Sequence, residues 1–426
     1  MNSIVACATG EEASALAVVR LSGSDAFSIA AKLSAEHEFK KFRQLELLLV
    51  SDSSGPLDRC LVVAFEGPRS FTGEDVVEFH LHGGPGLVEA VVQACIAAGA
   101  RRAEPGEYTR RAYLAGKLDL VEAEAIAARA GAATARAARL AEAGVAGRLS
   151  EFCRNIEVEL TVLRAGIEAW LDFAPEELRA EDQAKLVERL GGCAKRLQKA
   201  SDLAQRSLPL FEAPIVLLAG PVNAGKSSLF NALVGSERAL VSAEAGTTRD
   251  WIEVDLALPA GRIRLRDSAG LRVAAGAVEA AGIERALALQ NEADLVLWCL
   301  GPGQNDEPPE AALCIRTQAD LDPSARVSAT TGVGIEELLQ TLSEHIFRQV
   351  AADSETGVIT SRRQMQLLSA AAERCFSALQ AMNDSALEFA ASDLRGAAEA
   401  LAELTGTQEP DELMLDALFS QFCLGK

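Results

Sequence analysis

The sequence lacks a long apolar run, paired cysteines and an excess of basic residues. None of its stretches approaches the ~20 apolar residues that span a bilayer, and the first residues carry Glu11 and Glu12 without a basic segment. The nine cysteines include neither a Cys-x-x-Cys pair nor zinc-ligand spacing, which is typical of a reducing compartment. These absences predict a soluble, untargeted cytoplasmic protein with no membrane partner.

Positive charge is scarce, because 41 lysines and arginines face 61 aspartates and glutamates and leave a net charge of −20. A nucleic acid could therefore be held only by a local basic patch that works against the overall field. A solvated arginine-rich face would explain such a patch equally well. The candidate cluster comprises Arg101, Arg102, Arg110, Arg111 and Lys117.

The chain is long enough for about two to four domains. Residues 1–117 mix short strand-like runs with helical spacing, which predicts an α+β domain. Residues 118–211 and 351–426 have apolar residues three and four apart, which predicts one split all-α helical domain. Residues 212–350 alternate strand, turn and helix, which predicts an inserted α/β P-loop domain with a parallel sheet flanked by helices.

A complete phosphate-binding loop, Gly220–Ser227, follows the apolar run Ile215–Ala219. In such a loop the backbone N–H groups surround phosphate oxygens, Lys226 reaches the outer phosphates, and the Ser227 hydroxyl ligates magnesium. Helical spacing then continues, as the pattern requires. The predicted nucleotide contacts here are Asn223, Ala224, Gly225, Lys226, Ser227 and Ser228.

Two switch-like motifs follow in the order expected of a GTPase. Gly246–Asp250 matches a first switch, in which Thr248 would hold magnesium. The alternating run Ile263–Arg266 leads into Asp267–Gly270, where the aspartate would bind magnesium through water and the Gly270 amide would sense the γ-phosphate. The three motifs together predict a GTPase rather than a generic ATPase.

Asp320 is the residue predicted to recognise guanine, because its carboxylate can accept two N–H bonds from the base edge. Its motif reads Thr-Gln-Ala-Asp from Thr317, whereas GTPases usually have Asn-Lys-x-Asp. The backbone of Ser328, Ala329 and Thr330 follows at the right distance to contact the guanine oxygen.

The catalytic water has no obvious partner, because Leu271 occupies the position of the usual glutamine. Glu279 and Glu284 are both candidates for the hydrolytic base, and either could instead lie on a solvated helix face. The side-chain oxygen of Asn223 would lie beside the phosphates, where a monovalent cation could supply positive charge.

Motifs outside the nucleotide domain cover nearly the whole chain: Arg20–Gly23, Ser70–Asp75, His82–Pro85, Glu104–Ala112, Gly116–Leu120 and Phe422–Lys426. Together they resemble the MnmE/TrmE family of bacterial tRNA uridine-modification GTPases. The resemblance implies a folate-binding and dimerising N-terminal domain, a split helical domain and an inserted GTPase domain. It also makes tRNA the partner expected at the arginine cluster.

The resemblance further implies a particular chemistry. With a flavoprotein partner of the MnmG type, in a heterotetramer, the family adds an aminomethyl or carboxymethylaminomethyl group to carbon five of the wobble uridine in certain tRNAs. The one-carbon unit comes from a tetrahydrofolate derivative, and FAD and NADH act on the partner. A homodimer forms through the N-terminal domain, and the GTPase domains pair when GTP and K⁺ bind.

Residue by residue, the resemblance assigns Glu279 as the water-orienting residue and Lys226 as catalytic, and places Gly246 at the nucleotide. The implied ligands are Ser227 and Thr248 for Mg²⁺; Asn223, Ser242, Glu244 and Thr247 for K⁺; and Arg20, Glu78, Lys117 and Lys426 for folate. Without the family, a surface ion-pair network would explain the last set. Cys423 is either a nucleophilic thiolate beside Lys426 or a buried anchor of the last helix.

The chain departs from the family pattern at its N terminus, where residues 10–15 replace a Pro-Pro-Gly-Arg-Gly-Gly stretch, and in the phosphate loop, where the proline stands one place early at Pro221. Two other functions are alternatives to this one. A ribosome-assembly or RNA-chaperone GTPase would act as a binding switch, but the chain has no recognisable RNA-binding appendage. A folate-dependent transferase would leave the complete Asp267–Gly270 switch unexplained.

Overall fold

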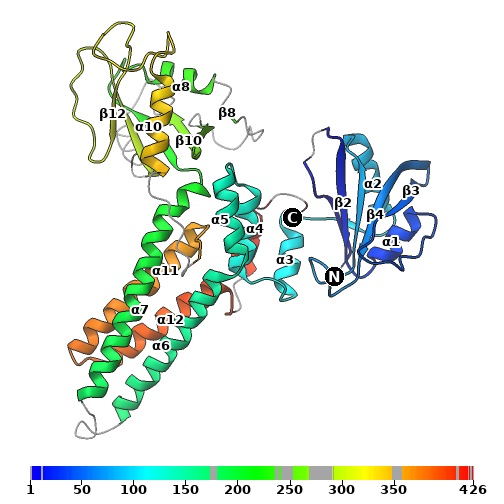
Figure 1. Ribbon diagram of the computed structural model, residues 1–426, viewed down its shortest axis with the longest axis horizontal. Coiled ribbons are helices and arrows are strands. Elements are labelled where there is room, and N and C mark those ends of the chain that lie inside the picture. The colour runs from blue at the N-terminus through cyan, green and yellow to red at the C-terminus, as the bar shows by residue number, and fades with distance from the viewer. Residues whose placement is uncertain are drawn as a thin grey trace, which may run out of the picture. The chain divides into compact units, whose positions relative to one another are not determined.

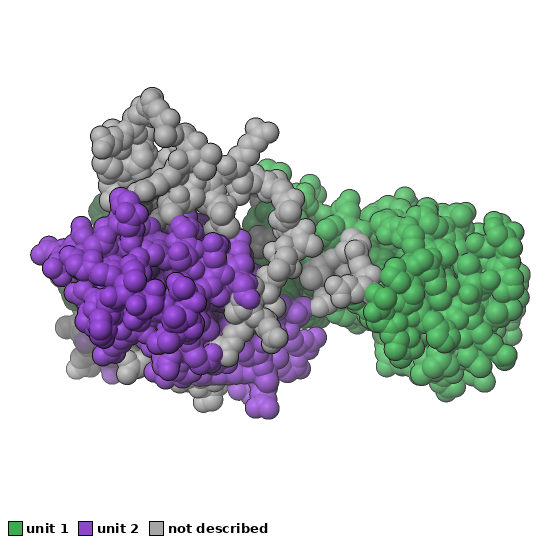
Figure 2. Space-filling view, turned by 90° about the horizontal axis from the view of Figure 1, so that it is seen from above, with its two compact units in different colours: residues 1–127, 153–178, 381–426 green, residues 128–152, 179–380 purple. Residues whose placement is uncertain are grey.

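The structure is a computed structural model in which two compact units are described (Figures 1 and 2). The first unit comprises residues 1–127, 153–178 and 381–426, and the second comprises residues 128–152 and 179–380. Within them, the described residues are 2–10, 13–172, 180–235, 239–240, 253–267, 290, 292–347, 357–408, 412–420, 422 and 425. The predicted boundaries at 117, 211 and 350 remain predictions.

The first unit contains a six-stranded sheet in the order β3-β4-β5-β2-β1-β6, antiparallel except for the pair β1–β6. Apolar residues alternate along the strands, so one face packs against two helices and forms the buried core. The elements are β1 (Ile4–Cys7), β2 (Leu16–Ser22), α1 (Ala26–Leu33), β3 (Glu46–Asp52), β4 (Gly55–Phe65), β5 (Val76–His82), α2 (Pro85–Ala97) and β6 (Arg101–Arg102). This arrangement confirms the predicted α+β class.

Helices complete the first unit. Apolar residues of helix α4 and of the last helix, α13, form a small core of their own, which includes Leu120 and Phe419. The C-terminal helix therefore packs against the start of the helical region. The helices are α3 (Glu107–Leu114), α4 (Leu120–Ala130), α6 (Arg148–Asp172), α12 (Leu387–Thr405) and α13 (Glu412–Phe419); α4 and α6 each continue into residues of the second unit.

The second unit contains a six-stranded sheet in the order β12-β11-β7-β10-β9-β8. Its strands are β7 (Ile215–Ala219), β8 (Ala239–Leu240), β9 (Glu253–Leu258), β10 (Gly261–Asp267), β11 (Leu295–Leu300) and β12 (Leu313–Arg316). The four strands β12, β11, β7 and β10 are parallel, as predicted, but β9 and β8 are antiparallel. The predicted parallel sheet therefore describes these four strands, and β9 and β8 make the whole sheet mixed. Two residues, Pro259 and Ala260, join β9 to β10, and so short a connection permits only a hairpin.

Helices α8 (Lys226–Val234) and α10 (Ile335–Phe347) lie next to this sheet in Figure 1 and pack with it into one apolar core. Gly261 allows the ring of Phe347 to approach the hairpin, since a Cβ atom there would collide with it. The remaining helices are α5 (Ala135–Val145), α7 (Ala180–Ser207), the short 3-10 helix η2 (Leu208–Leu210) and α11 (Arg362–Asn383). Among the described residues, no helix is long and apolar enough to cross a membrane.

Candidate nucleotide site

The phosphate loop connects the end of β7 to the start of α8, at the edge where the parallel strands end. Its glycines are conformationally required. Gly220 has φ 133°, and a Cβ atom at this position would collide with the carbonyl oxygen of Cys299 on β11. Gly225, with φ 78°, is the N-cap of α8, and Asn223 is left-handed with φ 64°. The loop therefore has the curled backbone that surrounds an anion.

Lys226 and Ser227 are the first residues of α8, and both side chains bond to groups at the phosphate loop. Lys226 Nζ donates hydrogen bonds to the carbonyl oxygens of Gly220 (2.8 Å) and Pro221 (2.7 Å). Ser227 Oγ donates to Asp267 Oδ2 at 3.1 Å. Because β10 runs parallel to β7 and ends at Asp267, the sheet itself brings this carboxylate to the loop.

A cavity of about 210 Å³ lies beside the loop. Asp320 lines it, and Ser328 Oγ donates a hydrogen bond to Asp320 Oδ1 at 2.6 Å, which orients the carboxylate. The lining includes Gly225, Ser228, Asp320, Ala329 and Thr330. The structure thus brings together the loop, the predicted guanine reader and the predicted backbone contact.

The remaining predicted contacts are Ser242, Glu244, Gly246, Thr247, Thr248, Gly270 and Glu279, which lie outside the described residues, as do Cys423 and Lys426. Their roles remain predictions.

Sequence reasoning missed three side chains that contact the loop: Gln304, Thr317 and Gln318. In the sequence, Thr317 and Gln318 stand out only as departures from the Asn-Lys-x-Asp pattern, which does not predict their contacts with the loop. Gln304 follows Gly301-Pro302-Gly303, a turn signal that predicts a reversal of the chain but not its target.

In the first unit, the described members of the predicted folate set engage protein partners. Arg20 on β2 lies opposite Glu78 on β5, and their side chains form an ion pair of 2.8 Å. The Arg20 guanidinium also lies over the rings of Phe71 (5.8 Å) and Tyr108 (5.6 Å). Lys117 Nζ donates to the carbonyl oxygen of Pro68 at 2.6 Å. The ion-pair interpretation therefore accounts for Arg20 and Glu78, and folate binding remains a proposal.

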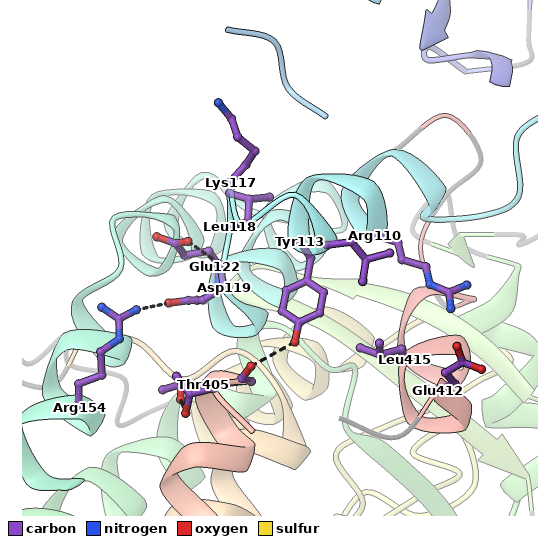
Figure 3. A pocket seen from close by; sticks show the side chains of 14 residues that line it. Arg110, Tyr113, Lys117, Leu118, Asp119, Glu122, Arg154, Thr405, Glu412 and Leu415 are labelled. Atoms are coloured by element: carbon purple, nitrogen blue, oxygen red, sulfur yellow. Dashed lines mark hydrogen bonds and ion pairs between the residues drawn. The ribbon is translucent and has the colours of Figure 1, made fainter. Parts of the chain in front are cut away.

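Lys117 also lines a cavity of about 740 Å³ in the first unit (Figure 3). In Figure 3 its side chain points away from the other labelled side chains. Other polar groups that line this cavity also bond within the protein: Arg154 pairs with Asp119 at 2.7 Å, and the Tyr113 hydroxyl donates to the carbonyl oxygen of Gly406 at 3.2 Å. Among the described lining residues, Arg154, Asp119 and Tyr113 are thus engaged with other groups of the protein.

The arginine cluster is not a free basic surface. Each of its arginines is paired with a carboxylate: Arg101 with Glu107, Arg102 with Glu89, Arg110 with Asp416, and Arg111 with Glu74 and Glu107. The prediction was wrong for Arg111, whose side chain is only 4% exposed. Helix α3 turns that position inward, where two acidic side chains compensate its charge.

The fold and this site define a P-loop GTPase-type protein. Comparison with known families gives two matches, to "GTP-binding protein TrmE N-terminus" over residues 3–117 and to "MnmE helical domain" over residues 120–423. The tRNA modification GTPase MnmE of Phenylobacterium zucineum is 37% identical, with 100% of both chains covered. The same-named protein of Chlorobium chlorochromatii is 35% identical, covering 99% of this chain and 98% of its own. The chain belongs to the MnmE family of tRNA modification GTPases.

Among solved structures, the G domain of the T. maritima FeoB iron transporter matches with 26% identity and a TM-score of 0.22, covering 32% of this chain and 100% of that one.

Proposed function

We propose that the protein binds and hydrolyses GTP and uses this activity to modify tRNA at carbon five of the wobble uridine. The observation that carries the nucleotide part is the convergence of Lys226, Ser227 and Asp267 on one loop, beside a cavity lined by Asp320. The tRNA part rests on the family, which matches along the full chain. The protein would act in the cytoplasm.

Magnesium fits the loop. A hydroxyl and a carboxylate 3.1 Å apart are hard oxygen donors, and Mg²⁺ prefers such ligands together with substrate phosphates. Ser227 would ligate the ion, Asp267 would hold it through water, and Thr248 would complete the set. A bound Mg²⁺ neutralises charge on the β- and γ-phosphates. Lys226 places a second positive charge at the same phosphates.

Potassium is proposed at Asn223, whose left-handed backbone is described, with Ser242, Glu244 and Thr247 as further ligands. A monovalent cation there would stabilise the charge that develops on the phosphates, a role that an arginine plays in other GTPases. Glu279 would orient the attacking water. The proposal predicts faster GTP turnover in potassium than in sodium, and indifference to the cation would remove Asn223 from the site.

The chemistry proposed for the tRNA is addition of an aminomethyl or carboxymethylaminomethyl group, with a flavoprotein partner that carries FAD and uses NADH. A tetrahydrofolate derivative would supply the one-carbon unit. Arg20 and Lys117 offer cations for its glutamate tail, and Glu78 offers a carboxylate for its pterin ring. Binding would require the Arg20–Glu78 ion pair to open or rearrange.

A homodimer through the N-terminal domain is supported by an exposed apolar face. Leu47 and Leu49 of the edge strand β3 and Leu61 of β4 are 55%, 50% and 41% exposed. These three leucines are called the leucine face below. A flat apolar edge strand invites pairing with another chain unless it is covered.

One experiment tests the function. The gene is deleted in the organism that carries it, and the wobble uridines of its bulk tRNA are analysed by mass spectrometry. Modified uridines are expected to disappear, to return with the intact gene and to stay absent with Lys226→Ala. Unchanged uridines in the deletion strain would defeat the tRNA assignment, whereas full restoration by Lys226→Ala would show that GTP is not needed. Full restoration by Glu279→Ala would remove that residue from hydrolysis.

A further inference from the structure

Three side chains from the segment after β11 hold the phosphate loop from behind. They donate hydrogen bonds to three consecutive carbonyl oxygens of the loop. The bonds run from Gln304 Nε2 to Val222 (2.8 Å), from Gln318 Nε2 to Asn223 (2.9 Å) and from Thr317 Oγ1 to Ala224 (2.6 Å). The loop backbone is thereby fixed on its carbonyl side.

Fixing the carbonyl oxygens also determines where the loop amides point. A peptide unit is planar and trans, so its N–H group points away from its C=O group. The carbonyls of Val222 and Ala224, bonded behind the loop, therefore direct the N–H groups of Asn223 and Gly225 toward the phosphate side, where they bind an anion. The N–H of Ala224 instead bonds within the loop to the carbonyl oxygen of Pro221 at 3.4 Å. A carbonyl that turned toward the phosphates would instead place a negative dipole against them.

Gln304 is held at both ends of its amide. Its Nε2 donates to the carbonyl oxygen of Val222, and its Oε1 accepts from the N–H of Gly301, each at 2.8 Å. The turn Gly301-Pro302-Gly303, with Gly303 at φ 73° and a bond from Gln304 N to Gly301 O, reverses the chain and returns Gln304 to the loop. One side chain thus joins the β11–β12 connection to the phosphate loop.

We infer that Gln304 is a positioning residue for nucleotide phosphates, acting through the carbonyl of Val222. The ring of Pro221 fixes the φ angle of that residue only, and Val222, which follows it, has no such covalent restraint. The hydrogen bond from Gln304 restrains the Val222 carbonyl instead. The inference rests on GTP binding by this loop. It assigns Gln304 to the phosphates and not to the base, since Gln304 does not line the cavity beside Asp320.

The test is Gln304→Glu, which keeps the size of the side chain and the acceptor for the Gly301 N–H but removes the donor to Val222. Gln304→Leu removes the donor without adding charge. The matched control is Gln340→Glu, the same change on α10, where Gln340 Nε2 donates to Glu344 Oε1 at 2.8 Å. Affinities of the full chain for GTP, GDP and guanosine are measured by competition against a fluorescent nucleotide, together with the nucleotide-free melting temperature.

Both Gln304 variants are expected to bind GTP and GDP about tenfold more weakly, the equivalent of about 1.4 kcal/mol. Their affinity for guanosine and their melting temperature should match those of Gln340→Glu, because a merely structural role would change these as well. Wild-type affinity for GDP in both Gln304 variants would overturn the inference, and so would an equal loss for guanosine. If the wild-type protein binds no GTP, the proposed function itself fails.

Discussion

At the scale of single residues, Ser227 and Asp267 decide how the site holds magnesium. Ser227→Ala removes one ligand, and Asp267→Asn removes the charge that would hold a metal-bound water. Losing a hydrogen bond or ligand of a charged group costs about 1.5–3 kcal/mol, so GTP affinity in Mg²⁺ should fall roughly 10- to 100-fold. Titration of each variant with a fluorescent GTP analogue, with and without Mg²⁺, measures the change.

The comparison with and without the metal makes this test specific. In EDTA the variants should bind nearly as the wild type does, because the metal-dependent interaction is already absent. Thr341→Ala, which removes an exposed hydroxyl of α10, serves as the control and should leave both affinities unchanged. A Ser227→Ala variant that is equally weakened in EDTA would show a damaged loop and not a lost magnesium ligand.

Glu107 gives the first unit a pH-dependent stability. Burial alone would raise the pKa of Glu107, but hydrogen bonds from Arg101, from the Glu104 N–H and from Arg111 outweigh it and hold this pKa below 4.5. A carboxyl whose pKa is lower in the folded state stabilises the fold above its unfolded pKa, and this contribution is lost as pH falls through the folded pKa.

Glu107→Gln should therefore lower the free energy of unfolding by about 2 kcal/mol at neutral pH and weaken its dependence on pH below about 4.5. Urea unfolding at neutral and acidic pH measures both effects. Glu89→Gln is the control, since the Glu89 side chain is 53% exposed and an exposed ion pair contributes about 0–1 kcal/mol. Parallel pH profiles for wild type and Glu107→Gln would contradict the assignment.

At the scale of elements, glycines in different settings should respond oppositely to alanine. Gly192 lies inside α7, is exposed, and has no atom within 4 Å of an added Cβ. Gly192→Ala should therefore stabilise the protein by about 0.5–1 kcal/mol through helix propensity. Gly220→Ala should destabilise it and abolish GTP binding, because the new Cβ collides with β11. Urea unfolding compares the two, and a destabilising Gly192→Ala would show that α7 does not tolerate a side chain there.

The elements of the nucleotide site also show which of its parts could be predicted from the sequence. Strand β7, the loop and helix α8 follow from local patterns, and β10 alternates so regularly that a strand leading up to Asp267 could be predicted. The contacts of Gln304, Thr317 and Gln318 depend on which loops the sheet order brings together, and local spacing carries no such information. The ion pairs of Arg110 and Arg111 depend on the fold in the same way, because their partners Asp416 and Glu74 come from distant segments.

At the scale of the whole molecule, the leucine face is the surface through which the proposed homodimer would form. Along β3 the side chains alternate, so Val50 is buried in the core while Leu47 and Leu49 point to the opposite face. Leu47 and Leu61 are direct partners in the register of β3 and β4, which makes the exposed apolar surface continuous across two strands. A second copy that covered this face would remove its apolar area from water.

The double variant Leu47→Lys/Leu49→Lys should therefore convert a dimer into a monomer with a mass near 44.9 kDa, because two charges cannot be buried in an apolar contact without large cost. Light scattering after size-exclusion chromatography measures the mass over a range of concentrations. Phe389→Lys is the control, since Phe389 is an apolar residue that is 71% exposed and belongs to helix α12, not to a strand of the sheet. If the double variant keeps the wild-type dimer mass, the interface lies elsewhere. If the wild type is itself a monomer at all concentrations, the homodimer proposal fails.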